Sequence, residues 1–80
     1  MISRILHDYP EFRLTSWGNG TAYCLLNKYE GRELFFQDDD ALEISDEIER
    51  LTEERPHLDY PDALAVIWND YEHCAREAVQ

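Results

Sequence analysis

Residues 11–27 read E-F-R-L-T-S-W-G-N-G-T-A-Y-C-L-L-N, and this stretch decides the fold. Apolar and polar residues alternate over residues 11–17, which is the period-two pattern of a strand with one buried face. The Asn19-Gly20 step supplies the positive φ angles that a tight hairpin turn requires. Residues 21–27 then return as a second strand, so the stretch predicts an antiparallel hairpin.

A second turn, K-Y-E-G at 28–31, leads into a third strand, R-E-L-F-F-Q at 32–37. The result is a three-stranded antiparallel meander with two distinct faces. We expect one face to carry Phe12, Leu14, Cys24, Leu26, Leu34 and Phe36. We expect the other face to carry Arg13, Trp17, Tyr23, Leu25, Glu33 and Phe35.

The second of these faces is too apolar to be bathed in water along its whole length. Either Ile2, Ile5 and Leu6 fold back over it, or it is a contact surface. Trp17 beside the hairpin turn has the same two interpretations, a lid over the sheet edge or the anchor of an interface.

The second half of the chain has the 3.6-residue period of helices. Asp40 is expected to cap the first helix, with Glu43 completing a capping box, and Pro56 to end it. Its apolar stripe is Ala41, Ile44, Ile48 and Leu51. Pro61 fits the first turn of a second helix. The stripe of that helix is Leu64, Trp68, Tyr71, Ala75 and Ala78, widened by Ile67 and Cys74.

These elements predict an α+β domain spanning residues 1–80, with a three-stranded meander followed by two helices packed on it (β-β-β-α-α). Ten aromatic residues and a 44% hydrophobic fraction can build a core, which argues against intrinsic disorder. A chain of 80 residues buries little surface, so a monomer and a weak homodimer are both open.

The formal net charge of −11 is placed unevenly along the chain. Residues 1–37 carry four acids and four bases, whereas residues 38–80 carry fourteen acids and three bases. Without a cluster of Lys or Arg, direct nucleic-acid binding and an anionic membrane surface are both disfavoured. A basic protein partner is the electrostatically natural one.

No apolar run is long enough for a signal peptide or a membrane span, which predicts a cytoplasmic protein with reduced, buried Cys24 and Cys74. The acid–His pairs Glu54–His57 and Asp70–His73 are not completed by further ligands, so we expect no metal and no cofactor. Neither a nucleophile elbow nor a phosphate-binding glycine loop is present in the sequence. The pattern therefore favours a protein that is not an enzyme.

The first helix has more carboxylates than solubility or capping requires. Asp38 and Asp39 at its start are explained by the helix dipole, whereas an acidic C-terminal end opposes it. A single-signed face is either solvated or a recognition surface, and both interpretations stay open. The candidate partner-binding residues are Asp38, Asp39, Glu43, Asp46, Glu47, Glu49, Glu53 and Glu54.

The motifs G-N-G-T-A-Y at 18–23, L-F-F-Q-D-D-D-A at 34–41 and Y-P-D-A-L at 60–64 carry a resemblance. Over about residues 12–71, the chain resembles small acidic proteins of proteobacteria and their prophages, in which the middle motif reads F-F-Q-G-D-D-A. Asp38 stands here in place of the glycine, which affects the turn. In size, acidity and lack of catalytic residues, the chain is also similar to phage-encoded anti-CRISPR proteins.

Several anti-CRISPR proteins are DNA mimics that act on Cascade-type complexes. The likeness implies a non-enzymatic inhibitor in a bacterial host cell, with the acidic helix presented to the Lys/Arg-rich groove of a CRISPR effector subunit. The alternative hypothesis is a small adaptor or dimerising module that uses the apolar face around Trp17, Tyr23, Leu25 and Phe35.

Overall fold

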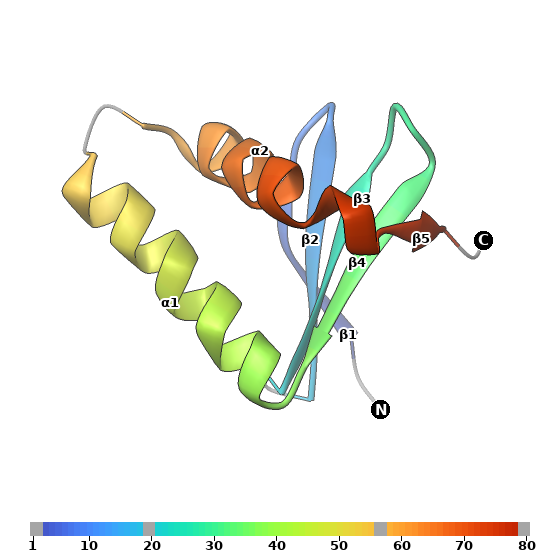
Figure 1. Cartoon of the computed structure of the whole chain (residues 1–80), viewed down its shortest axis with the longest axis horizontal. Helices are drawn as coiled ribbons and strands as arrows, with labels where there is room; N and C mark the ends of the chain where they lie inside the picture. The colour runs from blue at the N-terminus through green and yellow to red at the C-terminus, as the bar shows by residue number, and fades with distance from the viewer. Residues whose placement is uncertain (1–2, 19–20, 56–57, 79–80) are drawn as a thin grey trace.

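Five strands form one antiparallel sheet, and two helices follow the fourth strand in the chain (Figure 1). The computed structural model describes residues 3–18, 21–55 and 58–78. The strands, which lie side by side in chain order, are β1 (Ser3–Asp8), β2 (Phe12–Trp17), β3 (Ala22–Asn27), β4 (Arg32–Gln37) and β5 (Arg76–Glu77). The helices are α1 (Asp39–Glu54), α2 (Tyr60–Tyr71) and the short 3₁₀ helix η1 (Glu72–Cys74).

The α+β class and the β2-β3-β4 meander are confirmed, but the expected three-strand count is wrong. β1 pairs with β2 through a register shift between Ile5 and His7, and β5 pairs with the first two residues of β4. Of the two alternatives for the second sheet face, the one in which Ile5 and Leu6 fold back over it is wrong. Both residues lie in β1, which extends the sheet at its edge.

The expected faces of β3 are exchanged in the structure. Leu25 pairs with Leu14 and Leu34 and is 1% exposed, so it lies in the core. Tyr23 therefore faces the helices as well, whereas Cys24 and Leu26 lie on the opposite face. The predicted side was wrong for all four of these β3 residues.

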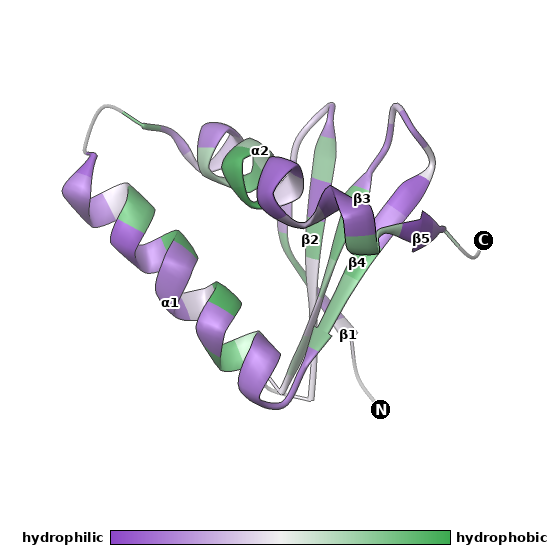
Figure 2. Cartoon of the chain, in the orientation of Figure 1, coloured by the Kyte–Doolittle hydropathy of each residue, from purple (hydrophilic) through white to green (hydrophobic). Residues whose placement is uncertain are grey.

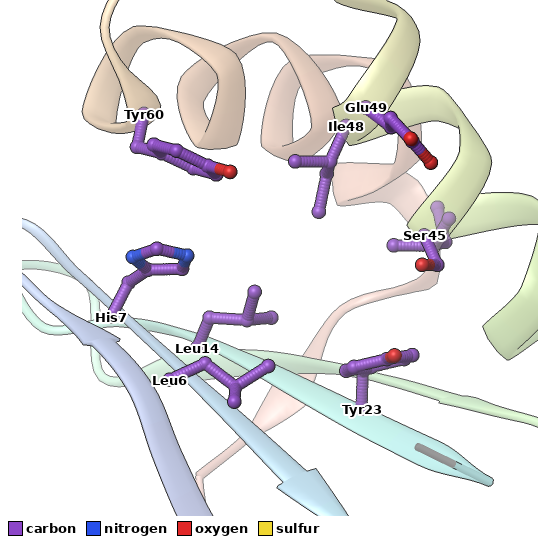
Figure 3. Close-up of a pocket in the computed structure, with 9 residues that line it drawn as sticks. Leu6, His7, Leu14, Tyr23, Ser45, Ile48, Glu49 and Tyr60 are labelled. Atoms are coloured by element: carbon purple, nitrogen blue, oxygen red, sulfur yellow. The ribbon is translucent and has the colours of Figure 1, made fainter. Parts of the chain in front are cut away.

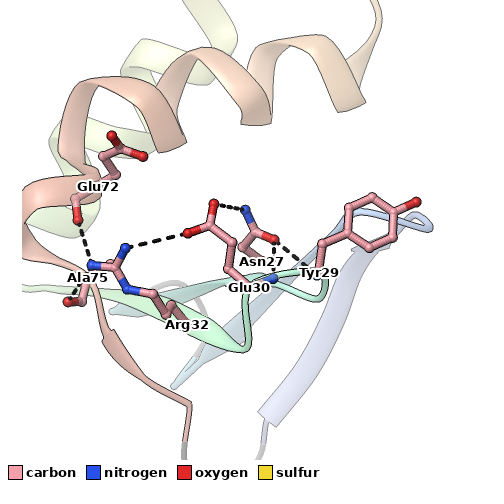
Figure 4. Close-up of polar contacts among 6 residues, drawn as sticks. All are labelled: Asn27, Tyr29, Glu30, Arg32, Glu72 and Ala75. Carbon is pink, nitrogen blue, oxygen red and sulfur yellow. Dashed lines mark hydrogen bonds and ion pairs between the residues drawn. The ribbon is translucent and has the colours of Figure 1, made fainter.

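Asn27 explains why the alternation of β3 misled the prediction (Figure 4). This polar residue is 3% exposed, on the same face as the core leucines. Its side-chain oxygen accepts hydrogen bonds from the backbone N–H of Tyr29 (3.0 Å) and Glu30 (3.1 Å), and its amide nitrogen donates to the Glu30 carboxylate (3.2 Å). The turn at 28–31 therefore satisfies a buried polar side chain.

The predicted apolar stripe of α1 is confirmed. Ala41, Ile44, Ile48 and Leu51 are all buried. Figure 2 shows the apolar residues of α1 on the side that faces α2. From α2, the core receives Ala63, Leu64, Ile67 and Trp68. Figure 1 shows α1 leaving the end of β4 and diverging from the sheet, with α2 between them.

The start of α1 differs from the predicted cap. The helix begins at Asp39, so Asp40 lies in its first turn and the expected capping box with Glu43 is wrong. Asp38 precedes the helix with φ 54° and ψ −124°, a conformation that glycine adopts far more easily than other residues. A glycine at this position would adopt this conformation without the strain that a Cβ atom adds.

α2 ends at Tyr71, so the predicted continuation of its stripe through Ala75 and Ala78 is wrong. The Arg32 guanidinium of β4 donates to the carbonyls of Glu72 and Ala75, both at 3.2 Å (Figure 4). The Glu72 carbonyl also accepts a hydrogen bond from the backbone N–H of Ala75 (3.0 Å), so Arg32 ties β4 to the turn that follows α2. These contacts also turn the chain back toward β4, where β5 forms.

Four predicted features fall on residues outside the described ranges. These are Ile2, the Asn19-Gly20 turn step, the helix breaker Pro56 and His57 of the Glu54–His57 pair.

Candidate functional site

α1 presents its acids in two rows, one beside the buried stripe and one on the side of the helix opposite to it. Spacings of three, four and seven residues keep the members of a row on one side of the helix. One row is Asp39, Asp46, Glu49 and Glu53. The other row is Asp40, Glu43, Glu47 and Glu54. The structure thus brings together seven of the eight predicted partner-binding residues on α1, and Asp38 directly precedes them.

The acids of α1 are mostly without ion pairs, in contrast to those of the sheet. On the sheet, Asp8, Glu30 and Glu33 each meet a Lys or Arg side chain. Of the eight acids on α1, Glu47 alone has an ion-pair partner among the described residues, and that partner is Arg50. The remaining carboxylates of the helix are exposed to solvent.

The two ends of α1 differ in how well the helix dipole accounts for their charge. Asp39 lies in the first turn, where the positive end of the dipole favours a carboxylate. Glu53 and Glu54 lie in the last turn, which contains no basic residue. Negative charge is unfavourable at that end, so the helix dipole does not explain these two acids.

The negative potential of α1 also reaches a neighbouring phenol. The pKa of Tyr71 is raised, first by burial and then by the charges of Glu43, Glu47, Asp70 and Asp40. Three of these four acids belong to one row of α1. The row therefore acts together on a group that belongs to α2.

The sheet face opposite the helices is the second candidate surface. Ile5 is 54% exposed on it, and Phe35 is 43% exposed beneath the Arg76 guanidinium, 5.6 Å from the ring centre. Trp17 is half-buried on the same face, next to Ala22. Of the four residues predicted for this surface, Trp17 and Phe35 lie on it, whereas Tyr23 and Leu25 lie under the helices.

The two cysteines are not the pair of buried apolar residues that we expected. Cys74 is exposed, and Cys24 is half-buried on the open sheet face. The Cys24 thiol donates to a Glu33 carboxylate oxygen at 2.8 Å. Burial, followed by this hydrogen bond, raises the pKa of Cys24 to about 12, so the thiol stays protonated and weakly nucleophilic.

Within the described residues, no group of three or more His, Cys, Asp or Glu side chains is arranged to hold a metal ion. Asp70 and His73 are both exposed. None of the described helices is long and apolar enough to cross a membrane.

Comparisons with protein-family models, with curated proteins and with solved structures find no match to this chain. The fold brings His7, Tyr23 and Tyr60 to one cavity beneath α1, where the sequence predicted neither His7 nor Tyr60 and placed Tyr23 on the other sheet face. They come from two strands and a helix, so no local spacing signalled them.

Proposed function

We propose that this protein is a non-enzymatic inhibitor that binds the basic, nucleic-acid-binding surface of another protein through α1. The observation that carries the proposal is the pairing contrast: the described acids of α1, apart from Glu47, have no ion-pair partner, whereas three sheet acids do. Acids without internal partners remain available to Lys and Arg side chains of a second protein.

The geometry of α1 suits a partner that normally holds a phosphate backbone. Two rows of carboxylates on a rigid helix offer repeated negative charge, with neighbours in a row ~5–6 Å apart at Cβ where they are one turn apart. The buried stripe fixes the helix, so little conformational entropy is lost when the acids are bound. Association with a basic groove would be fast and sensitive to salt.

Within this proposal, the partner is a CRISPR effector subunit of the Cascade type, and the inhibitor acts in the cytoplasm of a bacterial host. Asp38 and Asp39 extend the acidic rows at the start of the helix. The similarity in size, acidity and absence of catalytic motifs to phage-encoded anti-CRISPR proteins supports this choice of partner. The protein would then block recognition of target DNA by occupying its groove.

The proposal is tested by reversing three acids of α1, Glu43, Asp46 and Glu53, to Lys. The immobilised wild-type protein is expected to capture a bacterial partner that elutes with salt and with double-stranded DNA. The triple variant, shown to be folded by circular dichroism, is expected to lose that partner. Retention by the folded variant, or failure of DNA to displace the partner, would sink the proposal.

A matched control separates the acidic helix from the overall charge. Reversing Asp70, Glu72 and Glu77, which are exposed outside α1, changes the net charge equally. This control variant is expected to keep most of the binding. An equal loss in both variants would assign the effect to net charge rather than to α1. Purified Cascade-type complexes, assayed for target-DNA binding with each variant, test the finer assignment.

A second candidate function is a small adaptor or dimerising module that uses the open sheet face. The exposure of Ile5 and Phe35 on that face favours it. This function predicts association that depends on protein concentration and changes little between low and high salt, because apolar contacts are not screened. Sedimentation of wild type and Phe35→Ser over a range of salt concentrations distinguishes the two candidates.

A further inference from the structure

A cavity of about 300 Å³ lies where α1 diverges from the sheet (Figure 3). Three strands and both helices contribute side chains to it. Leu6 of β1 and Leu14 of β2 form one side, and Ile48 projects toward them from α1. This part of the cavity suits the aliphatic portion of a side chain.

Aromatic rings form two walls of the cavity. His7 and Tyr60 stack on one side, with ring centres 4.2 Å apart and planes at 26°. Tyr23 lies on the other side, beneath α1. Burial lowers the pKa of His7, so its ring is neutral near pH 7 and does not repel a cation.

The mouth of the cavity carries a carboxylate. Ser45 and Glu49 of α1 lie at its edge, and Glu49 belongs to the acidic row that contains Asp46 and Glu53. Glu49 has no ion-pair partner among the described residues. An aliphatic floor and aromatic walls therefore line the cavity, and a carboxylate without an ion-pair partner among the described residues lies at its edge on the α1 side.

We propose that this cavity receives an arginine side chain of the protein partner. The aliphatic stem would lie on Leu6 and Leu14, and the guanidinium would stack on an aromatic wall of the cavity, with the charge of Glu49 at the edge drawing it in. Arginine combines an apolar stem with a flat cation that stacks on rings and pairs with carboxylates. The inference rests on the proposed function and names how α1 and the sheet together hold a basic partner.

Charge complementarity favours arginine over an uncharged occupant. The cavity opens beside the row of Asp39, Asp46, Glu49 and Glu53, which have no ion-pair partner among the described residues, so a cation is drawn to it. An apolar or neutral aromatic side chain would fill the floor but would partly desolvate Glu49 without pairing it. Lysine could pair with Glu49, yet its compact ammonium cannot stack on the Tyr60 ring as a guanidinium can.

The test uses small probes in place of the partner. N-acetyl-arginine methylamide is titrated into the full chain while NMR follows the methyl groups of Leu6, Leu14 and Ile48. Saturable shifts centred on these methyls are expected. The norleucine analogue has the same kind of stem without the guanidinium, and it is expected to bind at least about fivefold more weakly.

Two matched variants locate the contact on α1. Glu49→Gln is expected to weaken arginine binding about fivefold, and Glu53→Gln, which makes the same change one turn away, is expected to leave it almost unchanged. Ser45→Phe, which fills the cavity mouth, is expected to abolish the saturable shifts. Circular dichroism is used to check that each variant is folded.

Several results would overturn the inference. Equal binding of the norleucine probe, or tighter binding of the corresponding tyrosine probe, would make the cavity a site for neutral side chains. Shifts spread along α1 and weakened equally by both Gln variants would make arginine a surface ligand only. That last result would leave the proposed function standing, whereas partner capture by the folded Lys triple variant would overturn that function and leave the arginine site intact.

Discussion

The carboxylates of the sheet half and those of α1 differ in their ion pairing. Residues 1–37 balance four acids with four bases, and three of those acids form ion pairs on the sheet. Residues 38–80 hold the whole net charge of −11, and α1 has a single ion pair among its described residues. In the sheet half, these ion pairs connect neighbouring strands and the turn at 28–31. α1 is held by its apolar stripe, and seven of its eight carboxylates have no ion-pair partner among the described residues.

The largest effect is expected from the stripe that attaches α1. Ile44 is 2% exposed, whereas Leu42, on the same helix, is 63% exposed. Ile44→Ala should lower the free energy of unfolding by about 2–5 kcal/mol, because it removes buried methyl groups and leaves a cavity. Leu42→Ala should change it by less than about 0.5 kcal/mol. Urea denaturation measures both, and similar losses would contradict the attachment through one stripe.

A smaller effect is expected from the polar centre of the sheet half. Asn27→Ala removes the buried side chain that holds the turn at 28–31 and leaves the backbone N–H groups of Tyr29 and Glu30 without their side-chain acceptor. The expected loss of unfolding free energy is about 1–3 kcal/mol. Asn69→Ala changes the same residue type at an exposed position of α2 and should cost little. If both variants lower the thermal stability equally, the hydrogen bonds of Asn27 do not stabilise the fold more than an exposed asparagine does.

The sequence predicts the parts of this fold that depend on local periodicity. The strands β2 to β4 and the stripe of α1 follow from alternation and from the helical period. β1 was missed because an edge strand such as Ser3–Asp8 is exposed on most of its length and shows no alternation. β5 depends on Arg32, whose contacts with residues 72 and 75 are too distant along the chain to be visible in a local pattern.

In the candidate site, too, some features follow from the local sequence and others depend on contacts between distant residues. The acidic rows of α1 are local, so the sequence predicts which residues share the helix surface. The face of β3 was wrong because Asn27 looks like a solvent-exposed residue in the pattern but is buried by its turn. The cavity beneath α1 could not be predicted, because Tyr23, His7 and Tyr60 meet only through strand register and helix placement.

The next smaller effect on the free energy of unfolding is expected at Asp38, where β4 joins α1. Asp38 has φ 54°, which strains a residue with a Cβ atom. Asp38→Gly should raise the free energy of unfolding by about 0.5–1.5 kcal/mol, since relief of strain exceeds the added flexibility of the unfolded chain. Asp39→Gly, one residue later within α1, should lower it by about 1 kcal/mol. Chemical denaturation of both variants checks the opposite signs, and destabilisation by both would contradict the strain.

The smallest expected effects test the difference in ion pairing between the sheet acids and the acids of α1. Hydrogen bonds from Lys28 and then Arg13 lower the pKa of Asp8 below its ordinary value of 3.8. The stabilising contribution of Asp8 is therefore present above about pH 4 and is lost as the pH falls through its lowered pKa. Asp8→Asn should be destabilising at pH 7 and should converge with wild type in strong acid.

Glu53→Lys should have the opposite sign at pH 7. It removes the repulsion from Glu49 one turn earlier and places a cation at the negative end of the α1 dipole. The expected gain is about 0.5 kcal/mol, and it should shrink in 1 M salt because the charges are exposed. If Glu53→Lys destabilises the protein as Asp8→Asn does, Glu53 has a stabilising partner within the fold and the contrast between the regions fails. If the signs differ, α1 keeps its acids at a cost to its own stability, as expected of a surface selected for binding.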